Sequence, residues 1–227
     1  MWIGKVDIAE LRLSSSWKAE FFSGEEKGLL RSKSPLVRLS EVVDIRRESI
    51  EPQSKKNEEF NYIGLENIES LTGELLEFSP KMGSEIKSRS RVFFRNDILY
   101  GRLRPYLNKV YLADGRISNG ICSGEFFVII PDVSKILPIY LRWILASDYI
   151  LDSVSRWQVG SALPRVQLEK LLGINIPLPS LKKQQDYERY FKKKMDEYKI
   201  HAQKVQILPK EIINTFTTSL ESGVKIS

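Results

Sequence analysis

The sequence of 227 residues contains only one cysteine and one histidine. A single cysteine cannot form an intramolecular disulfide, and one cysteine with one histidine cannot supply the usual nitrogen and sulfur ligands of zinc. Cys122 precedes an apolar run and lies far from the histidine in the sequence. We therefore interpret it as a structural thiol rather than a nucleophile, and we expect no metal site.

Long hydrophobic runs and catalytic motifs are also missing. No stretch approaches the roughly 20 apolar residues of a membrane-spanning helix, and residues 1–7 lack a signal-peptide pattern. We therefore expect a cytoplasmic protein without membrane contact. The sequence has no glycine-rich phosphate loop and no Gly-x-Ser-x-Gly motif. These absences predict a protein that binds a partner and is not an enzyme.

The positive charge of the chain is concentrated in one segment. Lysine and arginine outnumber aspartate and glutamate by six in the whole chain, and residues 87–116 alone hold eight basic and two acidic residues. Six of those eight are arginines, whose planar guanidinium matches a phosphate or the edge of guanine. Aromatic side chains and Asn108 lie between them, which suits contacts to a nucleic-acid backbone and groove. The alternative is a solvent-exposed strand face whose charge is incidental.

Hydrophobic periodicity predicts an α+β fold. Short apolar segments alternate with turn residues over 36–130, which predicts a mostly antiparallel, strongly curved sheet. Apolar residues then recur at three- and four-residue steps and predict one amphipathic helix over 137–154. A short helix around Leu171 follows, and 174–179, with two prolines, suits an edge strand or extended connector. Individual strands are expected at residues 36–45, 62–65, 75–78, 90–94, 98–100, 109–112 and 124–130.

The last segment, from Leu181 to about Leu220, predicts a long helix of the coiled-coil type. Its apolar residues repeat every seven positions, at Phe191, Tyr198, Val205 and Ile212. Such a stripe indicates a helix that packs along another helix, and at ~1.5 Å per residue the helix would be on the order of 60 Å long. Pro209 is expected to kink or split it. The alternative is that the segment folds back as two helices on its own sheet.

Four motifs in one order resemble a known family. Residues 96–110 resemble the Gly-Asp-Ile-Leu-Tyr-x-Lys/Arg-Leu-Arg-Pro-Tyr-Leu-x-Lys run in target recognition domains of type I restriction-modification specificity subunits. Residues 122–126 resemble the family's Cys-Ser-x-Glu-Phe segment, and 160–165 resemble its Gly-Thr-x-x-Pro-Arg loop. Residues 176–185 resemble its Ile-Pro-Leu-Pro-Pro-Leu-x-x-Gln-Gln hinge into a long helix. One departure is Asn96, which stands where the family often has glycine.

The resemblance implies three parts: residues 1–35 as the lead-in, 36–179 as the target recognition domain, and 180–227 as a long helix for dimerisation and subunit docking. The family's full subunit carries two recognition domains, each of which reads half of a bipartite DNA site, and this chain resembles half of it. The resemblance also implies a non-catalytic subunit that holds no cofactor and binds double-stranded DNA. It would direct DNA methyltransferase (modification) subunits, together with a restriction subunit, to that site.

The same reasoning gives specific site residues. Because the heptad stripe needs a partner helix, we predict a twofold homodimer through Phe191, Tyr198, Val205 and Ile212 that reads an inverted repeat. An RNA-binding protein, or a coiled-coil interaction module without a restriction-modification role, remains the alternative. The residues predicted to contact DNA are Arg91, Arg95, Arg102, Arg104, Tyr106, Asn108, Lys109, Gln158, Ser161 and Arg165.

Overall fold

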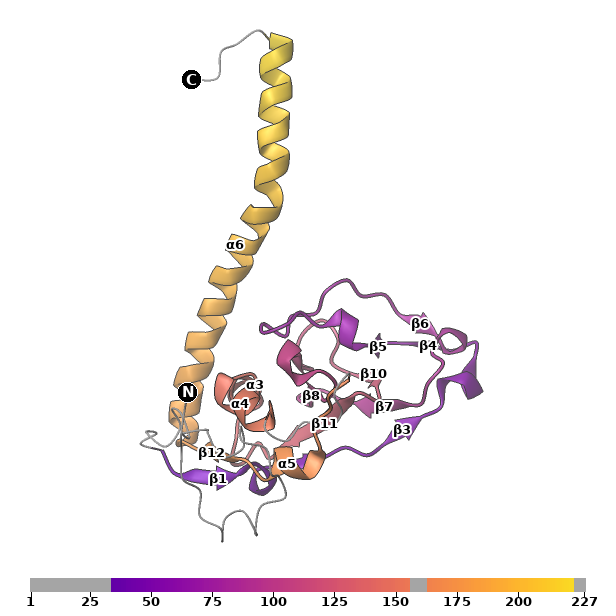
Figure 1. Cartoon of the computed structure of the whole chain (residues 1–227), viewed down its shortest axis with the longest axis vertical. Coiled ribbons are helices and arrows are strands. Elements are labelled where there is room, and N and C mark those ends of the chain that lie inside the picture. Colours follow the sequence, from indigo (N-terminus) through magenta and orange to yellow (C-terminus); the bar gives the residue numbers. More distant parts are fainter. Residues whose placement is uncertain (1–33, 156–162, 223–227) are drawn as a thin grey trace, which may run out of the picture. The chain divides into compact units, whose positions relative to one another are not determined.

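The structure is a computed structural model that describes residues 34–155 and 163–222. It divides into two compact units, one that extends to Gln184 and one that begins at Gln185. The first unit holds the sheets and short helices, and the second holds most of one long helix (Figure 1). The fold class predicted from the sequence is confirmed: mostly antiparallel sheets with helices, and then a long C-terminal helix.

The first four-stranded sheet is antiparallel throughout and has the order β2-β11-β8-β9. Its strands are β2 (Val43–Ile45), β11 (Phe126–Pro131), β8 (Ile98–Gly101) and β9 (Val110–Leu112). Strand β8 is buried along its whole length, and β11 is buried at all but one position. Strands that are covered on both faces have continuous apolar sequences instead of alternating apolar and polar residues, and the sequences of β8 and β11 follow this pattern.

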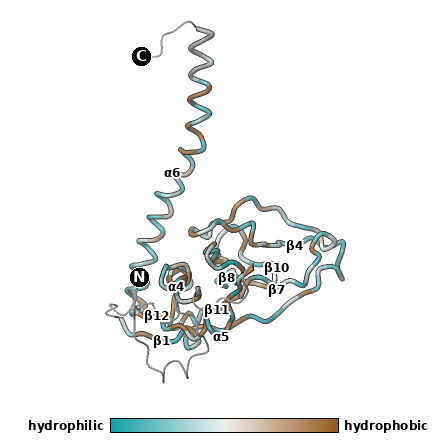
Figure 2. The backbone as a smooth tube through the Cα atoms, viewed as in Figure 1, coloured by the Kyte–Doolittle hydropathy of each residue, from teal (hydrophilic) through white to brown (hydrophobic). Residues whose placement is uncertain are grey.

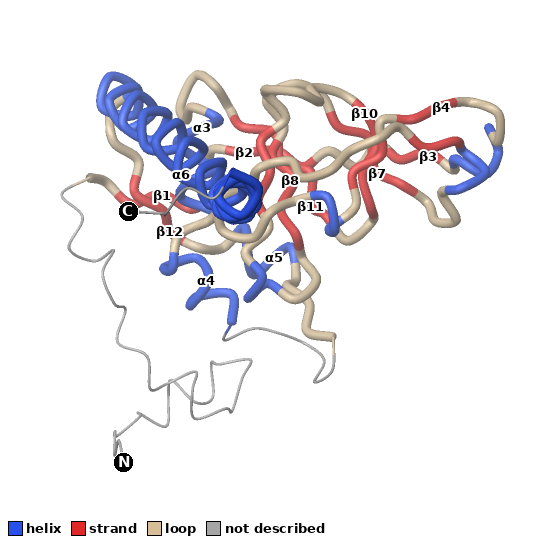
Figure 3. The backbone as a smooth tube through the Cα atoms, turned by 90° about the horizontal axis from the view of Figure 1, so that it is seen from above, coloured by secondary structure: helices blue, strands red, loops and turns tan. Residues whose placement is uncertain are grey.

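The second four-stranded sheet has the order β3-β7-β10-β5. It consists of β3 (Ser49–Ile50), β7 (Ser90–Phe93), β10 (Gly120–Ser123) and β5 (Tyr62–Ile63). Strands β10 and β5 run parallel, whereas the other neighbours are antiparallel. Figure 3 shows β3, β7 and β10 beside β8 and β11 of the first sheet. The sequence pattern did not predict β10, since the strand expected over 124–130 is β11.

Two small sheets complete the β-structure. Strand β1 (Leu36–Arg38) pairs antiparallel with β12 (Asn175–Pro177), so the Pro-containing segment is an edge strand, as predicted. Strand β4 (Glu59–Phe60) pairs with β6 (Lys81–Met82). The expected strand over 75–78 is wrong, because only an isolated bridge joins Leu75 to Ile68 there. The short 3-10 helices are η2 (Leu39–Glu41), η3 (Pro52–Lys55), η4 (Leu65–Asn67), η5 (Gly83–Glu85) and η6 (Pro105–Leu107).

The helix predicted over 137–154 is divided in two. Helix α3 (Pro138–Leu145) ends before Ser147, whose Oγ and backbone N–H both donate to the Ile144 carbonyl. Helix α4 (Asp148–Ser155) then begins with an acidic residue, which its positive N-terminal end favours. Ser and Asp therefore end one helix and begin the next, although the apolar period continues through both. A shorter helix, α5 (Leu168–Leu172), follows.

The first sheet has an apolar core on each of its faces. Along β8, Ile98 and Tyr100 face a cluster with α3, α4 and α5, whereas Leu99 faces the second sheet. Phe126 and Cys122 also belong to the second cluster. A fully buried side chain of this size contributes roughly 1.5–3 kcal/mol. Burial also raises the pKa of the Cys122 thiol, which supports its interpretation as a structural thiol.

Helix α6 (Leu181–Ser222) has 42 residues and is about 63 Å long at ~1.5 Å per residue. It passes through Pro209 without interruption, so the expectation of a split, like the alternative of two helices folded back, is wrong. The ribbon bends along its length instead (Figure 1), and hydrophilic and hydrophobic residues alternate along it (Figure 2). Within the described ranges, α6 and the other helices are too short or too polar to cross a membrane.

The first turn of α6 is fixed by Gln184, whose side chain is completely buried. Its Oε1 accepts from the Leu137 backbone N–H at 2.8 Å, and its Nε2 donates to the carbonyls of Lys135 and Pro179 at 3.0 and 2.9 Å. Both the oxygen and the nitrogen of this buried side-chain amide therefore have hydrogen-bond partners. The first glutamine of the predicted hinge motif is therefore a structural residue of the first unit.

The turn before β8 gives a stability prediction. Asn96 has a φ of 69°, in the left-handed region that glycine and asparagine tolerate best, which explains why either residue fits there. We expect Asn96→Gly to be nearly neutral and Asn96→Ala to lower the free energy of unfolding by about 1 kcal/mol. Urea unfolding measures both values. Arg95→Ala, at an exposed neighbour without positive φ, is the control, and equal losses in Asn96→Ala and Asn96→Gly would contradict the backbone explanation.

Candidate nucleic-acid interface

The sequence motif 96–110 and the described residues 163–165 of the motif 160–165 meet at the end of β8. The Arg104 N–H donates to the Pro164 carbonyl at 2.8 Å, and the Val166 N–H donates to the Arg102 carbonyl at 3.0 Å. Leu103 forms an isolated antiparallel bridge with Arg165. The basic end of the strand and the later loop are therefore one structural unit, although about 60 residues separate them.

A left-handed turn on each side shapes the loop that follows β8. Arg104 has a φ of 48° and Asn108 a φ of 47°, and η6 lies between them with Pro105 as its first residue. Left-handed backbone costs roughly 1–2 kcal/mol in a residue other than glycine. Arg104 and Tyr106 are exposed, Tyr106 to 54%. Strained backbone that presents exposed side chains is typical of functional loops.

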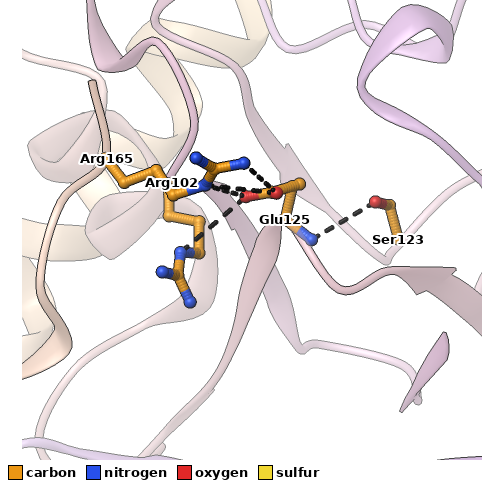
Figure 4. A network of polar contacts seen from close by, with 4 residues as sticks. All are labelled: Arg102, Ser123, Glu125 and Arg165. Atoms are coloured by element: carbon orange, nitrogen blue, oxygen red, sulfur yellow. Dashed lines mark hydrogen bonds and ion pairs between the residues drawn. The ribbon is translucent and has the colours of Figure 1, made fainter. Parts of the chain in front are cut away.

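A carboxylate lies among the basic side chains of this loop region (Figure 4). Glu125, in the turn between β10 and β11, receives a bidentate contact from Arg165: Nη2 donates to Oε1 at 2.7 Å and Nε to Oε2 at 3.1 Å. Arg102 approaches the same carboxylate with its Nε 3.8 Å from Oε2, beyond hydrogen-bond distance. Its guanidinium also lies over the Phe127 ring at 5.3 Å.

The opposite charges of Glu125 and Arg165 each stabilise the ionised form of the other. The hydrogen bond from Arg165 lowers the pKa of Glu125, while burial opposes the shift and the positive charges of Arg165 and Arg102 add to it. The same hydrogen bond raises the pKa of Arg165. The Nε of Arg102 is buried and has no hydrogen-bond partner among the described residues. Glu125 is therefore ionised at neutral pH, and two guanidinium groups lie against this one carboxylate.

The structure brings four of the predicted DNA contacts together: Arg102, Arg104, Tyr106 and Arg165. Arg95 is exposed too, but it precedes β8 and so lies at the opposite end of that strand. Two other predicted residues, Gln158 and Ser161, lie outside the described residues.

Three further predicted contacts are turned into the domain, and two of them have hydrogen-bond partners there. Asn108 is buried and donates its side-chain N–H to the Ala146 carbonyl at 2.7 Å, so it holds the loop rather than facing solvent. Lys109 is half-buried and donates to the Leu65 carbonyl at 2.8 Å. Arg91 is opposite Cys122 in the sheet register, and directly opposed residues share a face, so it lies on the inward face with its Nε buried.

Glu125 was not among the residues predicted from the sequence. Two signals could have found it: Glu125 stands within the Cys-Ser-Gly-Glu-Phe motif, and it is a carboxylate close in sequence to a basic segment. Among the residues that the structure describes, clusters of three or more His, Cys, Asp or Glu that could hold a metal ion are absent. The arrangement is suited to binding a polyanion through exposed guanidinium groups.

Comparison with known proteins identifies the family. The family model described as the type I restriction modification DNA specificity domain matches residues 32–209, which is more than half of the chain. The chain belongs to this family. It carries one target recognition domain of a type I restriction-modification specificity subunit, which confirms the resemblance of the motifs.

Individual relatives of this specificity domain are distant. The chain is 26% identical over 193 residues to the Type I restriction enzyme EcoDI specificity subunit from Escherichia coli, which covers 78% of this chain and 41% of the relative. The chain therefore spans about two-fifths of that subunit's length.

Two solved structures show the same fold. The HsdS subunit from Thermoanaerobacter tengcongensis matches with a TM-score of 0.66 and 22% identity, over 87% of this chain and 52% of that one. A chain from a structure on complex assembly and conformational transition of the type I R-M system matches with a TM-score of 0.66 and 24% identity. That match covers 86% of this chain and 53% of the other.

The Glu125–Arg165 pair gives a prediction for acid stability. Because the folded pKa of Glu125 is lowered, its contribution is complete above its unfolded pKa of about 4.3 and is lost as pH falls through the folded value. We expect Glu125→Gln to flatten the dependence of melting temperature on pH between about 3 and 5, with only a small change at pH 7 because the pair is partly exposed. Thermal unfolding followed by circular dichroism measures this. Identical pH profiles would contradict a charged pair in the folded state.

Proposed function

We propose that this chain reads the DNA sequence for a type I restriction-modification complex. Its recognition domain binds one half of a bipartite site in double-stranded DNA, with Arg102, Arg104, Tyr106 and Arg165 as the principal contacts. The convergence of these residues from two distant segments on exposed loops is the observation that supports the proposal. The family to which the chain belongs supports DNA as the polyanion.

The contacts divide by chemistry. Arg102 and Arg104 suit phosphate oxygens, since a guanidinium offers a planar fork of donors. The exposed ring of Tyr106 stands between strained backbone turns and suits contact with sugar or base edges. Gln158 and Ser161 belong to the same segment as Arg165 and remain proposed contacts on the strength of the sequence motif. Asn108, Lys109 and Arg91 act through the shape of the domain, because their side chains are occupied or inward.

We further propose that the chain is non-catalytic and holds no cofactor. Modification subunits would supply the methyl-transfer chemistry, and a restriction subunit would join them. Helix α6 would hold these partners and a second copy of the chain. In α6 the predicted stripe is exposed at Val205 (72%) and Ile212 (62%), and an apolar stripe of this kind needs a partner. A twofold pairing of two copies would cover it.

A second apolar face supports a second partner for α6. Ile200 and Ile207 are seven residues apart and are exposed to 54% and 51%. At ~100° per residue they lie roughly opposite the stripe that contains Tyr198 and Val205. We assign the stripe to the second copy and this opposite face to a modification subunit. The two contacts can then form on one helix at the same time.

The DNA contacts can be tested by salt dependence. The probe is a labelled duplex pool with a randomised central segment, from which bound sequences are also recovered and sequenced. We expect Arg102→Gln/Arg104→Gln to weaken binding by about tenfold or more and to reduce the slope of log affinity against log salt by roughly two. Lys182→Gln/Lys183→Gln removes two exposed charges from α6 and is the matched control.

Four outcomes would contradict the proposal. A wild-type slope near zero would exclude a phosphate-binding surface. Stronger binding to structured RNA than to duplex DNA would favour the RNA-binding alternative. Recovered sequences without a common motif would leave only non-specific binding. Unchanged DNA retention in the Arg102/Arg104 variant would favour the alternative that the chain is an interaction module whose functional part is α6.

The dimer can be tested separately. We expect Val205→Lys/Ile212→Lys to convert a dimer to a monomer at micromolar concentration, because two buried lysines would lie in the helix interface. Ile200→Lys/Ile207→Lys changes the opposite face by the same chemistry and is expected to leave the dimer intact while weakening capture of a modification subunit. Size-exclusion chromatography with light scattering measures the mass. A wild-type monomer under these conditions would exclude the homodimer.

A further inference from the structure

We propose that Glu125 is a positioning residue for the DNA interface: its carboxylate holds Arg165 in place and directs the free edge of Arg102 toward a phosphate. This inference rests on the proposed function and deepens it. The fork of Arg165 uses Nε and Nη2 on the carboxylate, which leaves Nη1 on the opposite edge. Two guanidinium groups from separate segments thereby lie against one carboxylate, Arg165 through hydrogen bonds and Arg102 as an ion pair at 3.8 Å.

The backbone shows why the carboxylate is not needed to hold the segments together. The Arg102 N–H already donates to the Glu125 carbonyl at 2.9 Å, and the Arg102 carbonyl accepts from Val166 at 3.0 Å. The Glu125 N–H is a donor to Ser123 Oγ at 3.2 Å. The three segments are thus tied by main-chain bonds that do not involve the Glu125 side chain. The separate effect of the Glu125 carboxylate is therefore to orient the Arg102 and Arg165 side chains.

The charge of Glu125 is unfavourable for DNA binding by itself. A carboxylate on a phosphate-binding surface repels the ligand, and removing it would raise non-specific affinity. Here the two guanidinium groups outnumber it, and its side chain is only 30% exposed. A residue that costs electrostatic attraction but orders two binding groups improves selectivity more than affinity. Long arginine side chains lose rotamer freedom on binding, and pre-ordering reduces that loss.

The contact with Phe127 orders Arg102 from a second side. Its guanidinium lies over that ring at 5.3 Å, while Nε stands 3.8 Å from Oε2 of Glu125. The ring and the carboxylate together restrict where the two Nη groups can point. The Arg102 side chain is 32% exposed, so these groups remain within reach of a ligand.

The test compares specificity with affinity. The probes are the duplex with the motif selected by the wild-type chain and a scrambled duplex of the same composition. We expect Glu125→Gln to weaken binding to the selected duplex by about three- to tenfold and to leave binding to the scrambled duplex equal or stronger. Glu125→Asp, which keeps the charge on a shorter side chain, is expected to restore part of the selectivity. Glu77→Gln removes an exposed carboxylate that has no ion pair among the residues that the structure describes, and it is the matched control.

A variant that lacks both arginines separates positioning from other roles. If Glu125 acts through Arg102 and Arg165, adding Glu125→Gln to Arg102→Gln/Arg165→Gln will not weaken binding to the selected duplex further. A change in melting temperature with an unchanged ratio between the two duplexes would make Glu125 merely structural. A switch in the preferred base at one position, independent of Arg165, would make it a direct reader of cytosine. Either result overturns the inference, whereas failure of the wild-type chain to select a motif overturns the proposed function instead.

Discussion

Backbone hydrogen bonds between the end of β8 and residues 164–166 are the contacts on which the interface depends. They place Arg102, Arg104 and Arg165 beside one another, although each motif alone is only a basic strand end or a short loop. They also fix the entry to η6, whose neighbours Arg104 and Asn108 both have left-handed backbone. Because main-chain bonds do this work, the arginine side chains need not stabilise the loop and can be exposed.

The buried strands of the first sheet could be predicted from the sequence, because continuous apolar runs have few other interpretations. Strands β8 and β11 are found where the pattern placed them, and α6 spans the heptad segment. The break at Ser147 was missed, because the apolar period continues across it while a hydroxyl and an acidic residue end one helix and start another. The parallel pairing of β5 with β10 joins residues far apart in the sequence and leaves no local signal.

The candidate site could be predicted only in part, since charge counts do not show where a side chain points. Asn108 and Lys109 lie in the most basic segment, yet their partners are the carbonyls of Ala146 and Leu65, which are distant in sequence. Outside that segment, Arg142 is buried and donates from Nε to the Val110 carbonyl at 3.2 Å. Burial lowers the pKa of Arg142 to about 10, so it stays charged at neutral pH. Arginine serves the core here as well as the surface.

The left-handed backbone at Arg104 means that some substitutions of this proposed DNA-contacting residue would stabilise the domain. Glycine or asparagine at this position would relax the backbone, so a library selected for heat resistance alone would favour their replacement of arginine. The guanidinium would be lost in each such variant. Laboratory evolution of this domain therefore needs DNA binding as part of the selection. Selection for thermal stability alone would remove Arg104, which is proposed to contact the DNA.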